Sequence, residues 1–358
     1  MELMQAHNQW RDRPDDERFL NLNDLHAFTT NERDHSKQVV LSSRRMAFEP
    51  TDNNGLIVRG ETNTFAPTHW AFGQLAGLAK APADYLRSIP SAMAADCLNY
   101  GFQYARDVSD VGLLLYQNGG PRQVKAATGP NYGRIWNSEV TGTLCKLFGD
   151  GVTGRWHVPG EFNIAKPITK ESTTLYAGDR DMWCFLADGQ NDIEIKNRRF
   201  GKSGRLQRGF FIGNSEVGHK PIFLGGFLFD YMCCNHIIWG ASGFEEIRIR
   251  HTSGAPDRWL EEIMPALESY SNSETASITT AIAAAQQRRI DNVADFLANR
   301  FGPRMVGKLQ AVHQLEEQKP IETVFDAVTA ATALARGMPW VGPRVELERE
   351  AGKLLVAA

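Results

Sequence analysis

Between about residues 100 and 250, the chain is a series of short apolar runs separated by glycine and polar residues. The runs are rich in Val, Ile, Tyr and Phe and have the length of ordinary strands, which is the pattern of a β-sheet. Most links between them have hairpin length, so the pattern predicts a mostly antiparallel central sheet with helices segregated on one face. The runs are VGLLLYQ, ITKESTTLYAG, DMWCFLAD, DIEI, GFFIGN and PIFLGGFLFDYMCC.

After about residue 256 the pattern becomes helical. Pro256 and Asp257 suit the first turn of a helix, and a long amphipathic stretch later ends at Gly302 and Pro303. Together with the strands, these segments predict an α+β fold with a C-terminal helical region packed on the core. The helical stretches are DRWLEEIMPALESY, SETASITTAIAAAQQRRIDNVADFLANRFG, PIETVFDAVTAATALARG and PRVELEREAGKLL.

The chain before the strand-rich region is polar at first and then helical. Its first 60 residues are interrupted by prolines and by DNNG, so we expect an N-terminal extension with a short helix near Pro14 and short strands at QVVLSS and GLIVRG. Two helices should follow, one with Thr68 as N-cap and one opened by Pro82. A further helix is expected at WNSEVTGTLCKLFGDG. The predicted division has three parts: an extension at 1–60, an α+β core at 61–255 and a helical region at 256–358.

Composition places the chain among ordinary soluble proteins. It has 358 residues, 42% of them hydrophobic and 23% charged, and a net charge of -3. Its five cysteines are odd in number and include no CxxC pair, which argues against a disulfide framework and a zinc ribbon. The N-terminus is too polar for a signal peptide, and no run approaches the roughly 20 apolar residues of a membrane helix. We therefore expect a cytoplasmic protein with no membrane association.

The densest charge feature is KNRRFGKSGRLQR, at residues 196–208. It holds six cations and no acid, and without them the rest of the chain would carry a net charge of -9. Because the tract lies between two strand-like runs, it predicts a long hairpin loop. Cations at this density neutralise phosphates, and an aromatic side chain among them can stack on an unpaired base. The alternative is a solvated loop whose charges meet scattered acids. The candidate DNA-binding residues are Lys196, Arg198, Arg199, Phe200, Lys202, Arg205 and Arg208.

A second candidate is the turn GNSEVGHKP, at residues 213–221. Asn214, Ser215 and Lys220 offer hydrogen-bond donors to a phosphate, whereas the alternative is a plain turn built by Asn, Ser and Gly. The chain has no GxxxxGK[ST] sequence, which excludes ATP binding through a Walker loop.

No pattern specifies a catalytic or metal site. Cys233 and Cys234 would face opposite sides of a strand, so a packed strand is favoured over a metal site there. Sequences such as GxSxG and HExxH are missing. A two-metal nuclease can be imagined around nearby carboxylates, but solvated acids at strand ends are the favoured interpretation. We predict no catalytic residue, metal or cofactor. The carboxylates are Asp181, Asp188, Asp192 and Glu194.

Several stretches together resemble a family found on phages, prophages and plasmids, known as phage/plasmid-like protein or domain of unknown function 932. They are QWRDRPDDERF, APTHWAFGQLAGLAKAPADYL, NYGRIWNSEV, GFFIGNSEVGHKPIFLGGFLFDYMCCNHIIWGA, RIRHTSG and RVELEREAGKLL. The resemblance covers nearly the whole chain. The family usually has a single cysteine followed by Asn and Gly where this chain reads CCNH, so His236 is a departure. The resemblance implies a setting among replication and recombination genes, but no established reaction.

These observations predict a non-enzymatic protein of a mobile element that binds DNA, preferably single-stranded, as a homo-oligomer. Single-strand annealing or protection in phage recombination is the concrete version, and its similarity in outline to single-strand annealing proteins is an analogy of fold only. One alternative is an interaction protein that inhibits a host defence complex by using the basic loop as a docking arm. The other is a metal-dependent nuclease.

Overall fold

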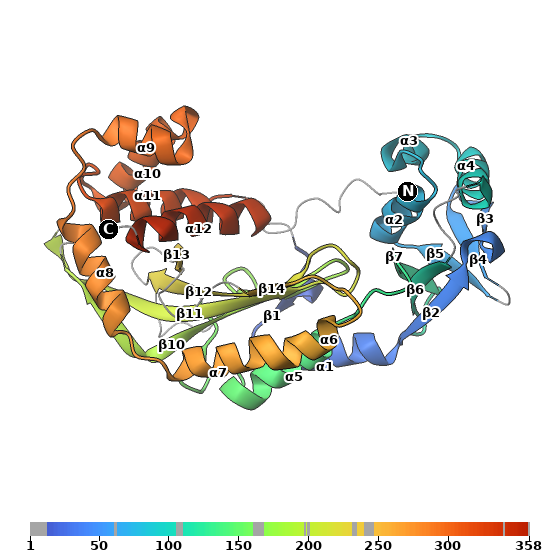
Figure 1. Ribbon diagram of the computed structural model, residues 1–358, viewed down its shortest axis with the longest axis horizontal. Coiled ribbons are helices and arrows are strands. Elements are labelled where there is room, and N and C mark those ends of the chain that lie inside the picture. The colour runs from blue at the N-terminus through green and yellow to red at the C-terminus, as the bar shows by residue number, and fades with distance from the viewer. Residues whose placement is uncertain are drawn as a thin grey trace.

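The computed structural model describes residues 13–60, 63–104, 110–159, 168–196, 198, 201–230, 235–239, 247–338 and 341–356. Within these residues the chain forms an eight-stranded sheet and a six-stranded sheet, each with its own helices (Figure 1). We call the six-stranded sheet with helices α2, α3 and α4 the small lobe, and the remainder the large lobe. The two lobes lie at opposite ends of the long axis of the molecule.

The sheet of the large lobe is antiparallel throughout its described pairings. Strands β10, β11 and β12 are the longest and form its centre, with β9 and β13 beside them. The order is β1-β9-β10-β11-β12-β13, while β8 pairs with β10 and β14 with β12. The strands are β1 (Arg18–Phe19), β8 (Trp156–His157), β9 (Leu175–Ala177), β10 (Met182–Ile195), β11 (Gly204–Asn214), β12 (Ile222–Asp230), β13 (Asn235–Trp239) and β14 (Ile247–Ile249).

One face of this sheet packs on a layer of helices that come from distant parts of the sequence. Met182, Leu186 and Ile212 of the sheet share a core with Leu25 and Leu144 of the helices. The apolar side chains of the layer recur at helical spacing, which turns one stripe of each helix to the sheet. The helices are α1 (Leu22–Asp34), α5 (Asn137–Phe148), α6 (Ala255–Arg258) and α7 (Met264–Asn272), with the π-turn Trp259–Ile263 between the last two.

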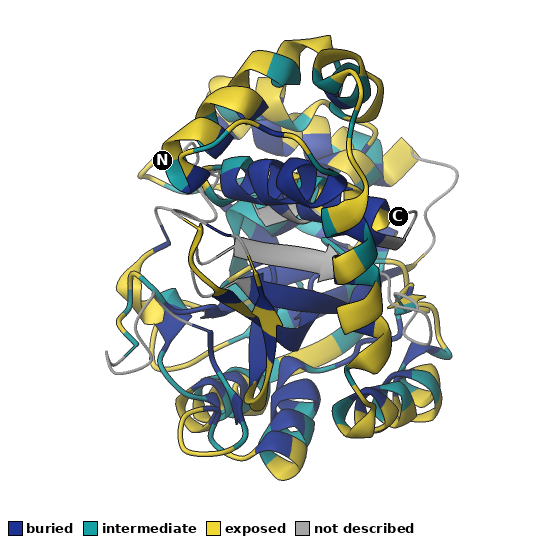
Figure 2. Cartoon of the chain, turned by 90° about the vertical axis from the view of Figure 1, so that its left-hand side faces the viewer, coloured by how far each residue is buried: buried dark blue, intermediate teal, exposed yellow. Residues whose placement is uncertain are grey.

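The C-terminal helices form a second layer. Helix α11 is rich in alanine and almost wholly buried, because α8, α10, α12 and β13 all contact it. Thr323 and Asp326 form a capping box at its start. This layer lies on the side of the sheet away from α5, α6 and α7 (Figures 1 and 2). The helices are α8 (Ala276–Gln287), α9 (Val293–Phe301), α10 (Val306–Glu317), α11 (Val324–Arg336) and α12 (Val341–Val356).

The sheet of the small lobe has the order β2-β6-β7-β5-β4-β3 and is antiparallel except for the β5–β7 pair. The three helices cover one of its faces, where Phe48, Val58 and Val124 pack against Leu75 and Leu98. The elements are β2 (Ser36–Ser42), β3 (Ala47–Pro50), β4 (Leu56–Arg59), β5 (Thr64–Pro67), α2 (His69–Leu78), α3 (Ala83–Ser88), α4 (Ser91–Tyr104), β6 (Asp110–Tyr116) and β7 (Gln123–Thr128).

The predicted fold class is confirmed: the protein is α+β, with mostly antiparallel sheets and a C-terminal helical region. It differs from the prediction in having two sheets, and in having helices on both sides of the larger one. The strands explain the second difference. Buried residues on β10 alternate between the face of Met182 and Cys184 and the face of Trp183 and Phe185, so both faces are apolar and both require cover.

The second apolar face is aromatic, and glycines make room for its rings. On this face of the β11–β12 pair, each of three glycines lies directly opposite a phenylalanine. A Cβ on any of these glycines would come within 2.4–2.5 Å of the facing ring. Gly209, Gly213 and Gly225 are therefore required by cross-strand packing rather than by turns. The pairs are Gly209 with Phe227, Gly213 with Phe223 and Gly225 with Phe211.

Residues 13–60 are built into both lobes. Strand β1 belongs to the larger sheet, β2, β3 and β4 belong to the smaller one, and Leu22 and Leu25 of α1 are fully buried. The strands predicted at QVVLSS and GLIVRG are present as β2 and β4. The described part of the expected extension is therefore core structure, because its apolar residues pair and pack with elements much later in the chain. Residues 1–12 lie outside the described residues.

Candidate nucleic-acid interface

The basic tract does not form one long loop. Strand β10 ends at Ile195 and β11 begins at Gly204, so the connection spans residues 196–203 and the last part of the tract is strand. The register explains this difference from the prediction: Ile195 pairs with Gly204 and Ile193 with Leu206. Leu206 is fully buried, so burial of this apolar side chain extends the strand into the charged sequence.

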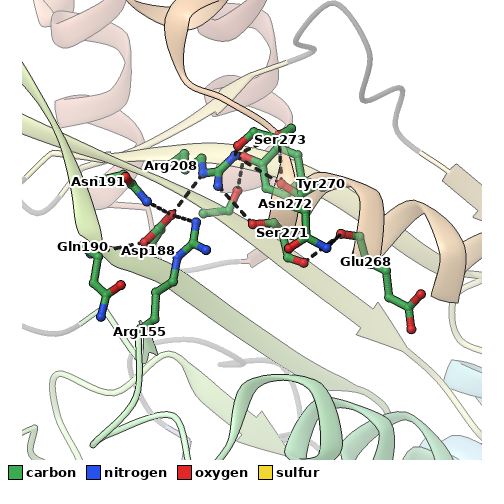
Figure 3. A network of polar contacts seen from close by, with 11 residues as sticks. Arg155, Asp188, Gln190, Asn191, Arg208, Glu268, Tyr270, Ser271, Asn272 and Ser273 are labelled. Atoms are coloured by element: carbon green, nitrogen blue, oxygen red, sulfur yellow. Dashed lines mark hydrogen bonds and ion pairs between the residues drawn. The ribbon is translucent and has the colours of Figure 1, made fainter.

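Arg208, on β11, is an internal residue. Its side chain is almost fully buried, and its Nε donates to Asp188 Oδ2 at 3.2 Å. Its terminal nitrogens donate to the carbonyl oxygens of Tyr270 at 3.2 Å and Ser271 at 3.1 Å, and also to Ser273 (Figure 3). These carbonyls end helix α7, where a cation is favoured by the helix dipole. Arg208 therefore ties β11 to the C-terminal end of α7.

Asp188 is the centre of this network. It lies where the β10–β11 register is interrupted, and it accepts two hydrogen bonds from Arg155 at 3.0 and 2.7 Å. The side chain of Asn191 donates to it at 2.9 Å and the backbone amide of Gln190 at 3.2 Å (Figure 3). Burial disfavours the carboxylate, but these hydrogen bonds and the Arg155 charge outweigh it and lower the pKa of Asp188 to about 2. The group is an ionised structural acid.

Arg198, near the tip of the hairpin, is also internal. Its Nε lies 3.2 and 3.3 Å from the two carboxylate oxygens of Glu317, the last residue of α10, and Nη2 contacts the same group. Both side chains are at most 3% exposed, and the guanidinium lies 5.7 Å from the ring of Phe325. Burial opposes ionisation of Glu317, yet the bonded guanidinium holds its pKa below the usual value. The hairpin is thus fastened to the C-terminal helices.

The remaining described cations of the tract are exposed: Lys196, Lys202 and Arg205. Arg205 lies 3.3 Å from Asp192, with its own side chain 67% exposed. The side chain of Gln286 donates to the Lys196 carbonyl at 3.0 Å, which places the end of α8 beside the hairpin. Arg199 and Phe200 lie outside the described residues.

The second predicted site faces inward. Asn214 is fully buried and donates to the Ile135 carbonyl and to Asn137 Oδ1, each at 2.8 Å. Ser215, also buried, donates to the Arg180 carbonyl at 2.7 Å and accepts from the His219 amide at 3.0 Å.

Lys220, the third residue of this group, has an acidic partner. Its ammonium lies 3.0 Å from Asp181 and over the Trp183 ring. Asn214, Ser215 and Lys220 therefore each contact groups within the protein, which agrees with the interpretation of this segment as a plain turn.

Three of the carboxylates considered for a metal site, Asp181, Asp188 and Asp192, have partners within the protein. Asp181 is bound by Arg13 at 2.6 Å and by Lys220, and despite burial these cations hold its pKa far below the usual value. Asp192 accepts from Gln207 at 2.9 Å. In the part of the chain that the structure describes, no group of three or more His, Cys, Asp and Glu side chains is placed to hold a metal. Cys233 and Cys234 lie outside that part.

Sequence reasoning missed a buried cluster at the joint between the lobes. Arg134 is 6% exposed, and its guanidinium lies 5.1 Å from the Tyr132 ring and 5.7 Å from the Trp136 ring. Its Nε and Nη1 have no hydrogen-bond partner among the described residues. Glu216 accepts from the Asn137 amide at 2.6 Å, and burial raises the pKa of this carboxyl.

The joint also binds the two lobes directly. Trp70 and Gln74, both on α2 of the small lobe, donate to the Val217 carbonyl of the large lobe at 2.9 and 2.7 Å. Tyr132 donates to the Ser215 carbonyl at 2.9 Å and stacks on His251. The alternation of Tyr, Arg and Trp in NYGRIWN is the sequence signal that could have located this cluster. Its buried geometry suits a structural joint.

Comparisons of the chain with protein-family models, with curated proteins and with solved structures return no match. The resemblance to the phage/plasmid-like family therefore stays a prediction, and function is inferred from the geometry of the chain itself. Among the described helices, none has both the length and the apolar character needed to cross a bilayer.

Proposed function

We propose that this chain is a non-enzymatic, cytoplasmic protein of a bacterial mobile element that binds single-stranded DNA through the tip of the β10–β11 hairpin. The observation that supports this best is that some cations of the basic tract are buried in ion pairs and others are exposed. Arg198 and Arg208 fasten the hairpin from inside, whereas Lys196, Lys202 and Arg205 project into solvent. Annealing or protection of single strands in recombination is the process we assign to it.

An anchored hairpin suits an electrostatic role. The buried ion pairs of Arg198 and Arg208 hold the hairpin near its tip and further along β11, so less conformational entropy is lost when the exposed ammonium and guanidinium groups meet phosphates. A local cluster can attract an anion although the whole chain carries -3.

The end of α8 extends the cationic surface. Gln286 joins it to the hairpin, and Arg288 and Arg289 follow directly in the sequence with exposed side chains. Arg289 lies 3.8 Å from Glu322, but its side chain is 81% exposed, and exposed pairs of this kind contribute little. The hairpin and the end of α8 together present five exposed cations: Lys196, Lys202, Arg205, Arg288 and Arg289.

The proposed association of copies is supported by helix α4. Met93, Cys97, Tyr100 and Tyr104 are exposed along one stripe, and α4 contains no cation. Their spacings of four, three and four residues match the seam of a coiled coil. If two copies of α4 pair antiparallel about a two-fold axis, Tyr100 of each copy faces Cys97 of the other, and Tyr104 faces Met93. Each large side chain therefore meets a smaller one. This geometry favours a second copy of the chain as partner.

The test of DNA binding replaces the three exposed hairpin cations by serine. The control replaces three exposed cations elsewhere, Arg44, Lys146 and Arg250, so that both variants lose the same charge. If three phosphates are contacted, the log–log salt slope for a single-stranded oligonucleotide should become less negative by about 2 in the hairpin variant. The control variant should keep the affinity and slope of the parent.

Equal binding by the two variants would remove the hairpin from the mechanism. Failure of the parent to bind DNA, combined with affinity for a host protein, would instead favour the alternative in which the chain inhibits a host defence complex.

A further inference from the structure

We infer that the small lobe carries a second contact for the same DNA strand: a groove of about 490 Å³ that takes one nucleotide. The inference rests on the proposed function, but the groove lies in a different lobe from the hairpin. Its size falls within the roughly 300–1,000 Å³ typical of ligand clefts.

The floor of the groove is apolar and includes an aromatic ring. Val39 on β2, Phe65 on β5 and Leu115 on β6 line it, and each is only half-buried. They adjoin the core that the lobe's sheet forms with α2, α3 and α4, yet those helices do not bury them fully. A half-exposed apolar floor with an aromatic face is a surface on which a base can stack whatever its sequence.

The rim of the groove is basic. Lys37 projects from β2, Arg122 stands at the start of β7, and His35 follows the end of α1. Lys37 and Arg122 are exposed, and Arg122 is steadied by hydrogen bonds to Gln117 and Asn63. Among the described residues that line the groove, none is a carboxylate. A cation on β2 and another just before β7 suit successive phosphates.

This charge pattern selects the occupant. A neutral apolar ligand would use the floor and leave the cations without a role, whereas a nucleotide unit uses both. An anionic lipid also combines an apolar part with an acid, and it is the rival occupant that the test must distinguish. We commit to single-stranded DNA, because it is the ligand for which an independent cationic surface exists on the hairpin.

Strand β2 offers a matched pair of substitutions. Lys37 pairs across the sheet with Leu115 in the groove, while its neighbour Gln38 pairs with Leu114 and faces the other side. Lys37→Gln and Gln38→Glu each make the chain more negative by one charge, on the same strand but on opposite faces. Any effect of net charge alone will therefore be the same in both variants.

The experiment measures fluorescence anisotropy of a labelled oligothymidylate of about 15 nucleotides, near the upper site size of a single-strand binding fold. Lys37→Gln should raise Kd several-fold at low salt and make the salt slope less negative by about 0.7, whereas Gln38→Glu should leave the slope unchanged. Phe65→Leu keeps the apolar packing but removes the stacking face. It should raise Kd by about five-fold or more with no change in slope.

Each outcome separates the groove from the hairpin. If the hairpin variant loses binding but Lys37→Gln behaves like Gln38→Glu, the groove is not a contact and the proposed function stands. If Lys37→Gln weakens binding and the hairpin variant does not, the hairpin proposal fails and the groove survives. A parent that binds no oligonucleotide overturns both proposals. If dodecanoate displaces the bound oligonucleotide by binding only in the groove, the groove would be assigned to an anionic lipid.

Discussion

Arg198 and Lys202 stand four residues apart in the same basic tract, and burial gives them opposite roles. The guanidinium of Arg198 is enclosed with the carboxylate of Glu317, so water does not screen this pair. The ammonium of Lys202 is exposed to water, which screens any interaction that it makes. A count of positive charges in a sequence therefore overestimates the charge available to a ligand. Arg208, paired with buried Asp188, is a second example.

The difference predicts contrasting stabilities. Arg198→Ser leaves the buried carboxylate of Glu317 without its cation and should cost about 3–5 kcal/mol of unfolding free energy. Lys202→Ser should change it by no more than about 0.5 kcal/mol, as is usual for exposed sites. Urea denaturation followed by circular dichroism will measure both. Equal stability of the two variants would contradict the assignment of Arg198 as an internal anchor.

At the scale of elements, the long helix expected between residues 273 and 302 is two helices. Helix α8 ends at Gln287 and α9 begins at Val293. Between them the backbone of Arg289 pairs with Thr323, and Asn292 accepts a hydrogen bond from the Asp295 amide as the N-cap of α9. The apolar periodicity alone could not show this break, because it continues across it. The cap sequence NVAD was the local signal.

Helix α4 allows a direct test of association between copies. In the antiparallel pairing, the two Cys97 residues lie about 4.5 Å apart along the helix axis, because three residues separate them at 1.5 Å each. A short thiol–thiol cross-linker should therefore yield a covalent dimer from the parent and none from Cys97→Ser. Since the stripe is small, the association should be weak and concentration-dependent.

A second variant distinguishes this interface from chance collisions. Tyr100→Ser should reduce both cross-linking and the dimer fraction in sedimentation velocity, whereas Tyr85→Ser, an exposed tyrosine on α3, should reduce neither. Efficient cross-linking in Tyr100→Ser would contradict the seam.

For the whole molecule, local sequence signals predicted many elements but did not predict which residues pair across long stretches of sequence. The Thr68 cap, the helix at Pro82 and the helix in WNSEVTGTLCKLFGDG are predicted by local features, and all are present. The partner of Arg198 lies 119 residues later, and that of Arg13 lies 168 residues later. No periodicity encodes such pairs. The sequence pattern therefore predicted where the hairpin lies, but it did not predict which of its cations are buried in ion pairs.

Desolvated carboxyls make the stability of the whole fold depend on pH. Desolvation raises the pKa of Glu17 and Glu348 to about 7, against 4.5 in the unfolded chain, although Arg13 and Arg344 oppose the shift. A raised folded-state pKa means that the folded protein binds more protons, so the contribution of these two groups to stability is fully present below about 4.5 and is lost as pH rises through 7. Burial lowers the pKa of several histidines, which makes stability rise with pH up to about 7.5, where the unfolded histidines have lost their protons, so this rise overlaps the loss from the carboxyls.

Comparison of the parent with a carboxyl variant isolates the carboxyls, because the histidines contribute equally to both. Between pH 6.5 and about 8, each of Glu17 and Glu348 should cost the parent about 1 kcal/mol of unfolding free energy. Urea unfolding at the two pH values measures the change, and Glu17→Gln combined with Glu348→Gln should shift the change by about 2 kcal/mol toward stability at the higher pH. An equal change in the parent and in the double variant would show that these carboxyls are ionised throughout and that their burial does not govern the stability of the fold.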